Sequence, residues 1–248
     1  MTEIPSLVQL LEAGVHFGHQ ESKWHPKMAP YIFGTRNDVH IIDLDKTRTK
    51  LREALDYVRD TVARGGVILF LGSKRQAKDI IKKYAEECGM PYISNRWLGG
   101  TLTNFSEIQR LVKRYNDLRS QLTSGALAKY TKKEQAGFAK QIEEMETKVG
   151  GMQSVTRPPD AIFIVDLKKE KTALLEAIEK HMPTIALVDS NVNPEDVTYP
   201  IPSNDDAVKT IELMVSLVAS AVNDGKVIRE ARVLEMQKAE VVKPPVGE

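Results

Sequence analysis

Residues 67–75, Val-Ile-Leu-Phe-Leu-Gly-Ser-Lys-Arg, contain the pattern that decides the fold of this chain. Five apolar residues in a row are typical of a strand that is covered on both faces. Gly72-Ser73 then predicts a turn into a helix from about Lys74 to Cys88. Similar apolar runs occur at 161–165 and 184–188, each followed by a further helical segment. This alternation predicts an α/β fold, in which a parallel sheet is covered by helices on both faces. The connections between its strands are expected to be right-handed crossovers.

The segments around these units complete the predicted organisation. Residues 39–44 are predicted as another strand and residues 45–64 as a helix. In residues 1–38, prolines and glycines exclude long elements, although a short helix capped by Ser6 is expected. The last helix is predicted near 205–222, before a polar tail. The expected parts are an N-terminal arm, 1–38; a sheet domain, 39–103 and 151–223; a helical insert, 104–150; and a C-terminal tail, 224–248.

Residues 104–150 follow a different pattern, in which apolar residues recur every three or four positions. One narrow stripe runs from Phe105 to Leu122 and a second from Phe138 to Val149, as expected for two helices that share little buried surface. Asn104 and Thr131 each precede a glutamate by three residues, which is the capping-box signal. We therefore expect an antiparallel helical hairpin that projects from the sheet domain. Its nine basic and six acidic residues favour an anionic neighbour.

Composition excludes several classes of protein. Of the 248 residues, 42% are hydrophobic and 28% are charged, which excludes a disordered or collagen-like chain. No apolar run approaches the roughly 20 residues of a membrane-spanning helix. The single Cys88 cannot form an internal disulfide, and the N-terminus resembles no targeting segment, so a cytoplasmic protein is expected. Residues 1–150 carry a charge of +6 and residues 151–248 of −5. This asymmetry indicates either a polyanionic partner for the first part or a chance scatter of surface charge.

The turn at residues 72–75 is the first candidate site. Sheets of this kind bind ligands at the carboxyl ends of their strands. Backbone N–H groups at a helix start, together with Lys74 and Arg75, suit an anion. Neither the dinucleotide-binding nor the P-loop glycine pattern occurs in the chain. An RNA phosphate is the favoured ligand, and a mononucleotide or simple helix capping are the alternatives.

Histidines cluster early in the chain. His16 and His19 are three residues apart, and Glu21 or His25 offers a third ligand for a metal ion. However, no cysteine accompanies them and the spacing matches no strong zinc signature. RNA contacts or packing are favoured, and no metal is predicted.

Other reactive residues suggest no catalysis. Cys88 is predicted at the end of a helix, where the dipole raises the pKa of its thiol. Asp43, Asp166 and Asp189 follow predicted strands, and turn or helix capping is favoured over a role as base or metal ligand. No catalytic residue and no cofactor are predicted.

Residues 95–104, Asn-Arg-Trp-Leu-Gly-Gly-Thr-Leu-Thr-Asn, are the most distinctive motif and join the sheet domain to the insert. Gly99-Gly100 allows a tight backbone path, and Trp97 offers a large apolar anchor. Arg96 and the hydroxyl groups suit phosphate oxygens. The alternative is a purely structural anchor for the base of the insert.

This motif and four others stand in the order found in one protein family. The others lie at residues 10–19, 24–34, 158–166 and 189–207. From about Ile4 to about Arg232, the chain closely resembles the family of small ribosomal subunit protein two, in its bacterial form. Several separated motifs in the correct order make this resemblance specific.

The resemblance implies a flavodoxin-like, three-layer sheet domain with an inserted coiled-coil hairpin. It also implies a structural, non-catalytic role on the cytoplasmic ribosome. The implied partners are small-subunit rRNA and other small-subunit proteins, including the OB-repeat, mRNA-binding ribosomal protein one, whose docking the family supports; no membrane is involved. The competing interpretation is a nucleotide- or sugar-phosphate-binding α/β enzyme, which a compact pocket with a base and an electrophile would favour.

Phosphate contacts through lysine and arginine are expected to dominate RNA binding. The candidates lie in the N-terminal arm, the sheet domain and the insert. They are Lys23, Lys27, Arg36, Lys74, Arg75, Arg96, Arg110, Lys113 and Arg114. Trp24, Tyr31 and Phe33 can stack on bases, but burial against the sheet is favoured.

Overall fold

The apolar runs form the centre of a five-stranded parallel sheet in the computed structural model, which describes residues 2–241. Its strands are β4 (Ile68–Leu71), β5 (Tyr92–Ile93), β6 (Ala161–Ile164), β7 (Thr184–Val188) and β8 (Tyr199–Pro202). Their order across the sheet is β5-β4-β6-β7-β8. Counted along the chain this is the order 2-1-3-4-5 of flavodoxin-like sheets. The expected parallel α/β fold is confirmed.

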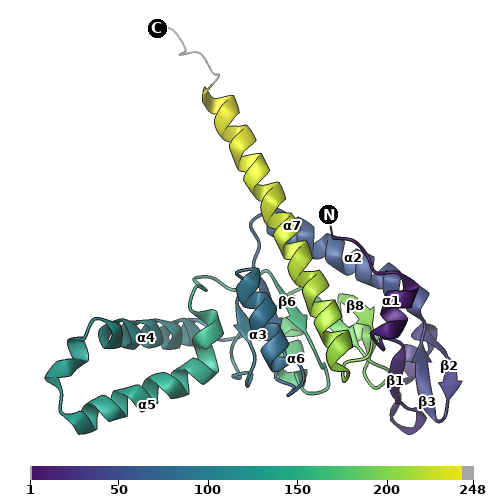
Figure 1. The fold of residues 1–248 in the computed structure, drawn as a ribbon, viewed down its shortest axis with the longest axis horizontal. Coiled ribbons are helices and arrows are strands. Elements are labelled where there is room, and N and C mark those ends of the chain that lie inside the picture. The colour runs from purple at the N-terminus through teal and green to yellow at the C-terminus, as the bar shows by residue number, and fades with distance from the viewer. Residues whose placement is uncertain (1, 242–248) are drawn as a thin grey trace.

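Helices cover both faces of this sheet (Figure 1). Phe70 and Phe163 point to one face, where they pack with α2 (Leu44–Ala63), α3 (Lys78–Glu87) and α7 (Val208–Val241). Leu69 and Ile162 point to the other, where they pack with α6 (Lys171–Glu179) and the base of the insert. Successive side chains of a strand alternate between faces, so covering both faces explains why Thr184 is the one polar residue in the three runs.

The N-terminal residues form a second, smaller sheet. Its strands are β1 (Phe17–Gln20), β2 (Ile32–Arg36) and β3 (Val39–Ile42), which pair antiparallel in the order β1-β3-β2. The strand expected at 39–44 therefore exists but does not belong to the parallel sheet. Asn37 and Asp38 both have positive φ, and this pair makes the tight turn between β2 and β3. Helix α1 (Leu7–Glu12) starts as predicted at Ser6, which forms a capping box with Gln9. Short 3-10 turns, η1 (Glu21–Lys23) and η2 (Pro26–Tyr31), connect β1 to β2.

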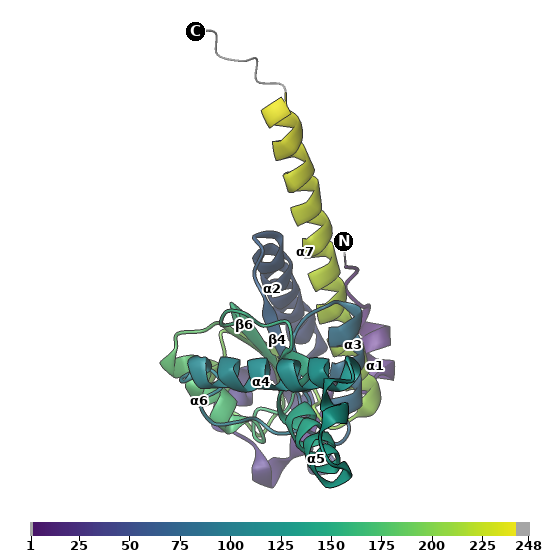
Figure 2. The same cartoon turned by 90° about the vertical axis from the view of Figure 1, so that its left-hand side faces the viewer.

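The insert consists of two helices, α4 (Phe105–Thr123) and α5 (Lys132–Val149), joined by η3 (Ala126–Lys129). Figure 2 views the pair from the side on which it extends away from the sheet. At its base, Tyr115 and Val149 are buried in the same apolar cluster as the sheet residues. Thr131 forms the predicted capping box, whereas the prediction for Asn104 is wrong, because its side chain makes no capping bond to α4.

The chain returns to the sheet through η4 (Gly150–Met152). Gly151 passes so close to Tyr92 that an added Cβ atom would lie 2.2 Å from the carbonyl oxygen of that residue. A glycine is therefore required where the insert meets the sheet domain. A last 3-10 turn, η5 (Pro194–Asp196), precedes β8, an edge strand that tolerates its two prolines.

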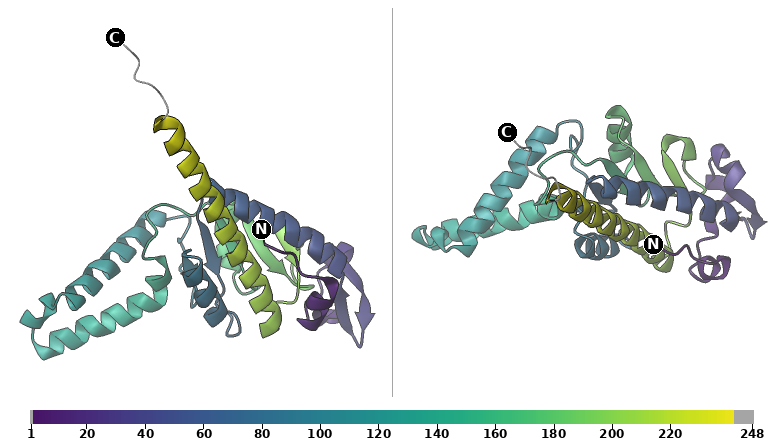
Figure 3. Two further views of the ribbon diagram at one scale, coloured as in Figure 1. Left: turned by 45° about the horizontal axis from the view of Figure 1, so that its top comes forward. Right: turned by 90° about the horizontal axis from the view of Figure 1, so that it is seen from above.

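Helix α7 is much longer than expected. The sequence predicted its end near 222 and a polar tail beyond, but the helix continues to Val241 and projects from the domain (Figures 1 and 3). Gly225 does not break it, because this glycine lies against α2, where an added Cβ would be 2.5 Å from the Arg59 carbonyl oxygen. The rest of the predicted tail, 242–248, lies outside the described residues. No described helix is long and apolar enough to cross a membrane.

Candidate nucleic-acid interface

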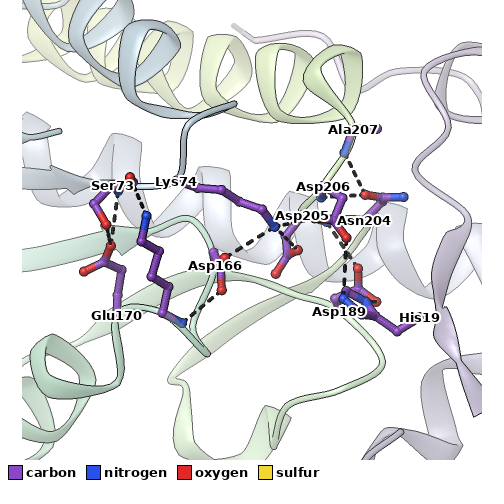
Figure 4. Close-up of polar contacts among 11 residues, drawn as sticks. His19, Ser73, Lys74, Asp166, Glu170, Asp189, Asn204, Asp205, Asp206 and Ala207 are labelled. Atoms are coloured by element: carbon purple, nitrogen blue, oxygen red, sulfur yellow. Dashed lines mark hydrogen bonds and ion pairs between the residues drawn. The ribbon is translucent and has the colours of Figure 1, made fainter. Parts of the chain in front are cut away.

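The chain order of the strands reverses between β4 and β6, and open parallel sheets bind ligands at this point. Here the backbone N–H of Ser73 donates to Glu170 Oε1 at 3.2 Å, and its hydroxyl donates to the same oxygen (Figure 4). Glu170 is buried, and burial raises the pKa of its carboxyl group. The carboxyl group of Glu170 thus stands where a phosphate was expected. Residues 74–77 form a turn and α3 begins only at Lys78, so the predicted helix starts four residues after Lys74.

Lys74 is held by three carboxylates of the same chain. Its Nζ lies 2.6 Å from Asp206, 2.9 Å from Asp205 and 3.3 Å from Asp166. The side chain is only 14% exposed. Burial opposes the charged form, but the hydrogen bonds to Asp206 and Asp205 outweigh it and raise the pKa of Lys74. The phosphate expected at Lys74 would have to compete with these aspartates, because the Lys74 ammonium already has anionic partners.

His19 extends the same cluster toward the small sheet. Its Nδ1 lies 3.0 Å from Asp189 and its Nε2 3.4 Å from Asp206. The hydrogen bond to Asp189 is the main reason why the pKa of His19 is raised. Asp205 lies deepest, and burial raises the pKa of its carboxyl group to about 7. The cluster joins β1 to the ends of β7 and β8.

The ligand atoms of four of these residues lie within 4.8 Å of one another, and imidazole and carboxylate are ligands of divalent metals. The four are His19, Asp189, Asp205 and Asp206. His16 is not among them, since its ring lies on Phe17. Lys74 already binds two of the four, and this arrangement suits an internal ion-pair network.

Two of the three strand-end aspartates have the turn or capping role that the sequence favoured. Asp43 accepts from the N–H of Asp45 at 3.0 Å and caps α2, and Asp166 accepts from the N–H of Lys169 at 3.0 Å. Asp189 instead holds His19. Cys88 is buried at the end of α3, and burial raises the pKa of its thiol to about 11.

The motif at 95–104 wraps around one buried carboxylate, that of Glu176 in α6. Oε1 accepts from the Trp97 indole N–H at 3.0 Å and the Gly100 N–H at 2.8 Å. Oε2 accepts from the Leu102 and Thr103 N–H groups at 2.9 and 3.1 Å and from the Thr103 hydroxyl at 3.2 Å. Burial alone would raise the pKa of Glu176, but these bonds, that from Trp97 foremost, lower it. The loop therefore anchors the insert, which was the structural alternative.

Sequence reasoning missed both Glu176 and Asp205. A signal for Glu176 was available, because it lies between Leu174 and Ala177 on the apolar face of α6, where a charge requires partners.

The remaining predicted cations lie on the surface. Lys27 and Arg110 each form an exposed ion pair, with Glu195 at 2.9 Å and Glu107 at 2.5 Å. Six others are exposed and form no ion pair within the described part of the chain. They are Lys23, Arg36, Arg75, Arg96, Lys113 and Arg114. The structure distributes these cations over the N-terminal arm, the sheet domain and α4 rather than gathering them in one pocket.

The aromatic residues of the N-terminal arm differ from one another. Phe33 is 81% exposed, so the favoured expectation of burial is wrong for it, because β2 is an edge strand with Phe33 on its outer face. Trp24 is 38% exposed and lies beside His40, and Tyr31 is half-buried.

The structure shows a doubly wound α/β domain that carries exposed cations on its body and on a projecting pair of helices. At the switch point of its sheet, Glu170 binds Ser73 and Lys74 binds three aspartates. The family model described as ribosomal protein S2 matches residues 10–225. The chain belongs to the ribosomal protein S2 family, whose members are structural proteins of the small ribosomal subunit. The family resemblance noted in the sequence is thereby confirmed.

Proposed function

We propose that this chain is held in the small ribosomal subunit mainly by contacts between its cations and rRNA phosphates. The observation that carries the proposal is the set of six exposed cations that form no ion pair with a described residue. Phosphate contacts of this kind position a protein on RNA and make its affinity depend on salt. Lys27 and Arg110 join the set, because exposed ion pairs contribute only about 0–1 kcal/mol and a phosphate can replace the carboxylate. Lys74 is excluded.

In this proposal, α4 and α5 act as a coiled-coil arm that carries cations to RNA beyond the sheet domain. The narrow apolar stripes support the pairing of the two helices. Lys113 and Arg114 are exposed on α4, and Glu176 holds the base of the arm.

An apolar groove supports the docking of a neighbouring protein. The family resemblance implies that this neighbour is the OB-repeat ribosomal protein one. The groove, of about 460 Å³, lies between α1 and the small sheet. Val8, Leu11 and Phe33 line it with exposed fractions of 64%, 54% and 81%. Apolar patches of this kind suit a protein partner better than RNA. The competing enzyme interpretation has no support at the switch point, where Glu170 binds Ser73 and Lys74 binds three aspartates.

The proposal is tested by sedimentation of a tagged chain with small subunits across a salt series. The double variant Lys113→Gln/Arg114→Gln should be released at lower salt than the unmodified chain. The matched control, Glu143→Gln/Glu144→Gln on α5, removes two charges of the opposite sign and should not be released earlier. Identical release of all three chains would contradict a role for the arm in phosphate binding.

A further inference from the structure

A basic cavity lies near the amino ends of β4 and β5, at the opposite end of these strands from the switch point. This cavity of about 270 Å³ is enclosed by the ends of α2 and α3, by the linker 154–157 that returns from the insert, and by α7. Its charged lining residues are Arg157, Lys226 and Arg229, and among the described residues no carboxylate lines it. None of the three is among the nine cations expected from the sequence.

Each of these cations keeps donors free for a ligand. Lys226 Nζ donates to the Cys88 carbonyl at 2.6 Å, and Arg157 donates to the Gly65 carbonyl at 3.0 Å and pairs with Asp160. The Arg229 guanidinium lies over Gly65, where an added Cβ would be 3.4 Å from its central carbon. Arg229 makes no hydrogen bond or ion pair to a described residue. A lysine carries three donors and an arginine five, so most remain available.

The neighbouring cavity shows why charge, not size, decides which of the two suits an anion. At about 790 Å³ it is larger, and it shares Gly89, Met90 and Ser154 with the basic cavity. However, three glutamates and only two cations line it. They are Glu86, Glu143 and Glu146, with Lys82 and Arg119. An anion is repelled there and attracted to the smaller cavity.

We propose that the basic cavity binds a phosphodiester group of RNA, with Arg229 as its principal ligand. Lys226 assists from α7 and Arg157 from the linker 154–157. Arg157 is 52% exposed and Arg229 is also exposed, so the site is open to a polymer and not only to a small anion. This inference rests on the proposed binding of rRNA, and it assigns a contact beside the point where the insert rejoins the sheet.

The test measures binding of the full chain to protein-free small-subunit rRNA over a series of KCl concentrations. For Arg229→Gln, the slope of log K against log salt should fall in magnitude by about 0.7–0.9, the value for one lost phosphate contact. Arg229→Lys should restore most of it. The matched control is Arg232→Gln, which removes an exposed charge from the same helix outside the cavity and should leave the slope unchanged. Because Arg229 has no described hydrogen bond within the chain, its variants should retain the circular dichroism of the unmodified protein.

An Arg229→Gln slope equal to that of the unmodified chain, or an equal decrease in Arg232→Gln, would overturn the assignment of this cavity while leaving rRNA binding intact. Failure of the unmodified chain to bind rRNA in a salt-dependent way would instead reject the proposed function. A third arm titrates inorganic pyrophosphate. Thermal stabilisation by pyrophosphate that depends on Arg229, without any change in RNA binding, would assign a free phosphate ligand and also overturn the RNA contact.

Discussion

Adjacent residues of the same charge can have unrelated roles, as Lys74 and Arg75 demonstrate. Both follow the turn after β4. Lys74 points into the domain and binds Asp205 and Asp206, whereas Arg75 is exposed and forms no ion pair with a described residue. A cation contributes to folding in the first environment and is free to bind a phosphate in the second.

Lys74→Ala should therefore destabilise the protein by about 3 kcal/mol, since removing one partner of a buried ion pair leaves the others uncompensated. When measured on folded protein, Lys74→Ala should leave the salt slope of rRNA binding unchanged. Arg75→Ala should change the free energy of unfolding by no more than about 0.5 kcal/mol and reduce the salt slope by about 0.7–0.9. Urea unfolding and the KCl series measure the two quantities. A lower salt slope in Lys74→Ala and a loss of stability in Arg75→Ala would contradict the roles assigned to these two residues.

At the scale of elements, the loop 95–104 and α6 form the joint between the sheet domain and the insert. Five donors of the loop converge on one carboxylate, and Trp97 fills the space beside it. A charged acceptor satisfies several backbone N–H groups that no strand or helix would otherwise pair. The orientation of α4 therefore depends on Glu176 as well as on the apolar base of the insert.

Glu176→Gln retains the shape of the side chain but removes its charge and turns an NH₂ group toward N–H donors. Hydrogen bonds to charged groups contribute about 1.5–3 kcal/mol each, so a loss of about 2–3 kcal/mol in unfolding free energy is expected, together with faster proteolysis within 95–104. The control is Glu179→Gln, an exposed glutamate one turn further along α6, which should be neutral. Unchanged proteolysis in Glu176→Gln would show that the carboxylate does not hold the joint.

At the scale of the whole molecule, one polar cluster connects the two sheets. His19 comes from β1 of the small sheet, and Asp189 and Asp206 follow strands of the parallel sheet. The pKa of His19 is raised by its hydrogen bond to Asp189, and that of Asp205 is raised to about 7 by burial. The folded protein therefore binds protons at these groups more tightly than the unfolded chain does.

The sign of the resulting pH dependence follows from linkage. Stability from His19 is fully present below its ordinary pKa of about 6.5 and is lost as pH rises through the higher pKa of the folded state. Asp205 acts in the same direction, since its carboxyl group ionises near pH 4 in the unfolded chain but only near pH 7 in the folded state, so its contribution is lost as pH rises from about 4 to about 7. The free energy of unfolding should thus decrease between pH 6 and pH 8, and less steeply in His19→Gln.

Urea unfolding at pH 6, 7 and 8 measures this difference. The control is His181→Asn, which replaces an exposed histidine at a positive φ that asparagine tolerates, and which should keep the steep decrease. Equal pH dependence in His19→Gln and the unmodified chain would rule out His19 as a contributor.

The sequence by itself determined the parallel α/β core, the two helices of the insert and the family. Apolar runs, 3.6-residue stripes and the capping boxes at Ser6 and Thr131 are local patterns, and local patterns are readable because they depend on neighbours within a turn or a strand. Even so, periodicity could assign residues 39–42 to a strand but not to a sheet.

Only the tertiary structure decided which charged groups serve the fold and which are free. Lys74 meets Asp205 across 131 positions, and Gly100 meets Glu176 across 76. It also decided that Gly225 continues α7, because the glycine lies against α2. Ion pairs, buried carboxylates and close backbone contacts depend on distance in space, and distance along the chain carries no information about it until the sheet has brought the segments together.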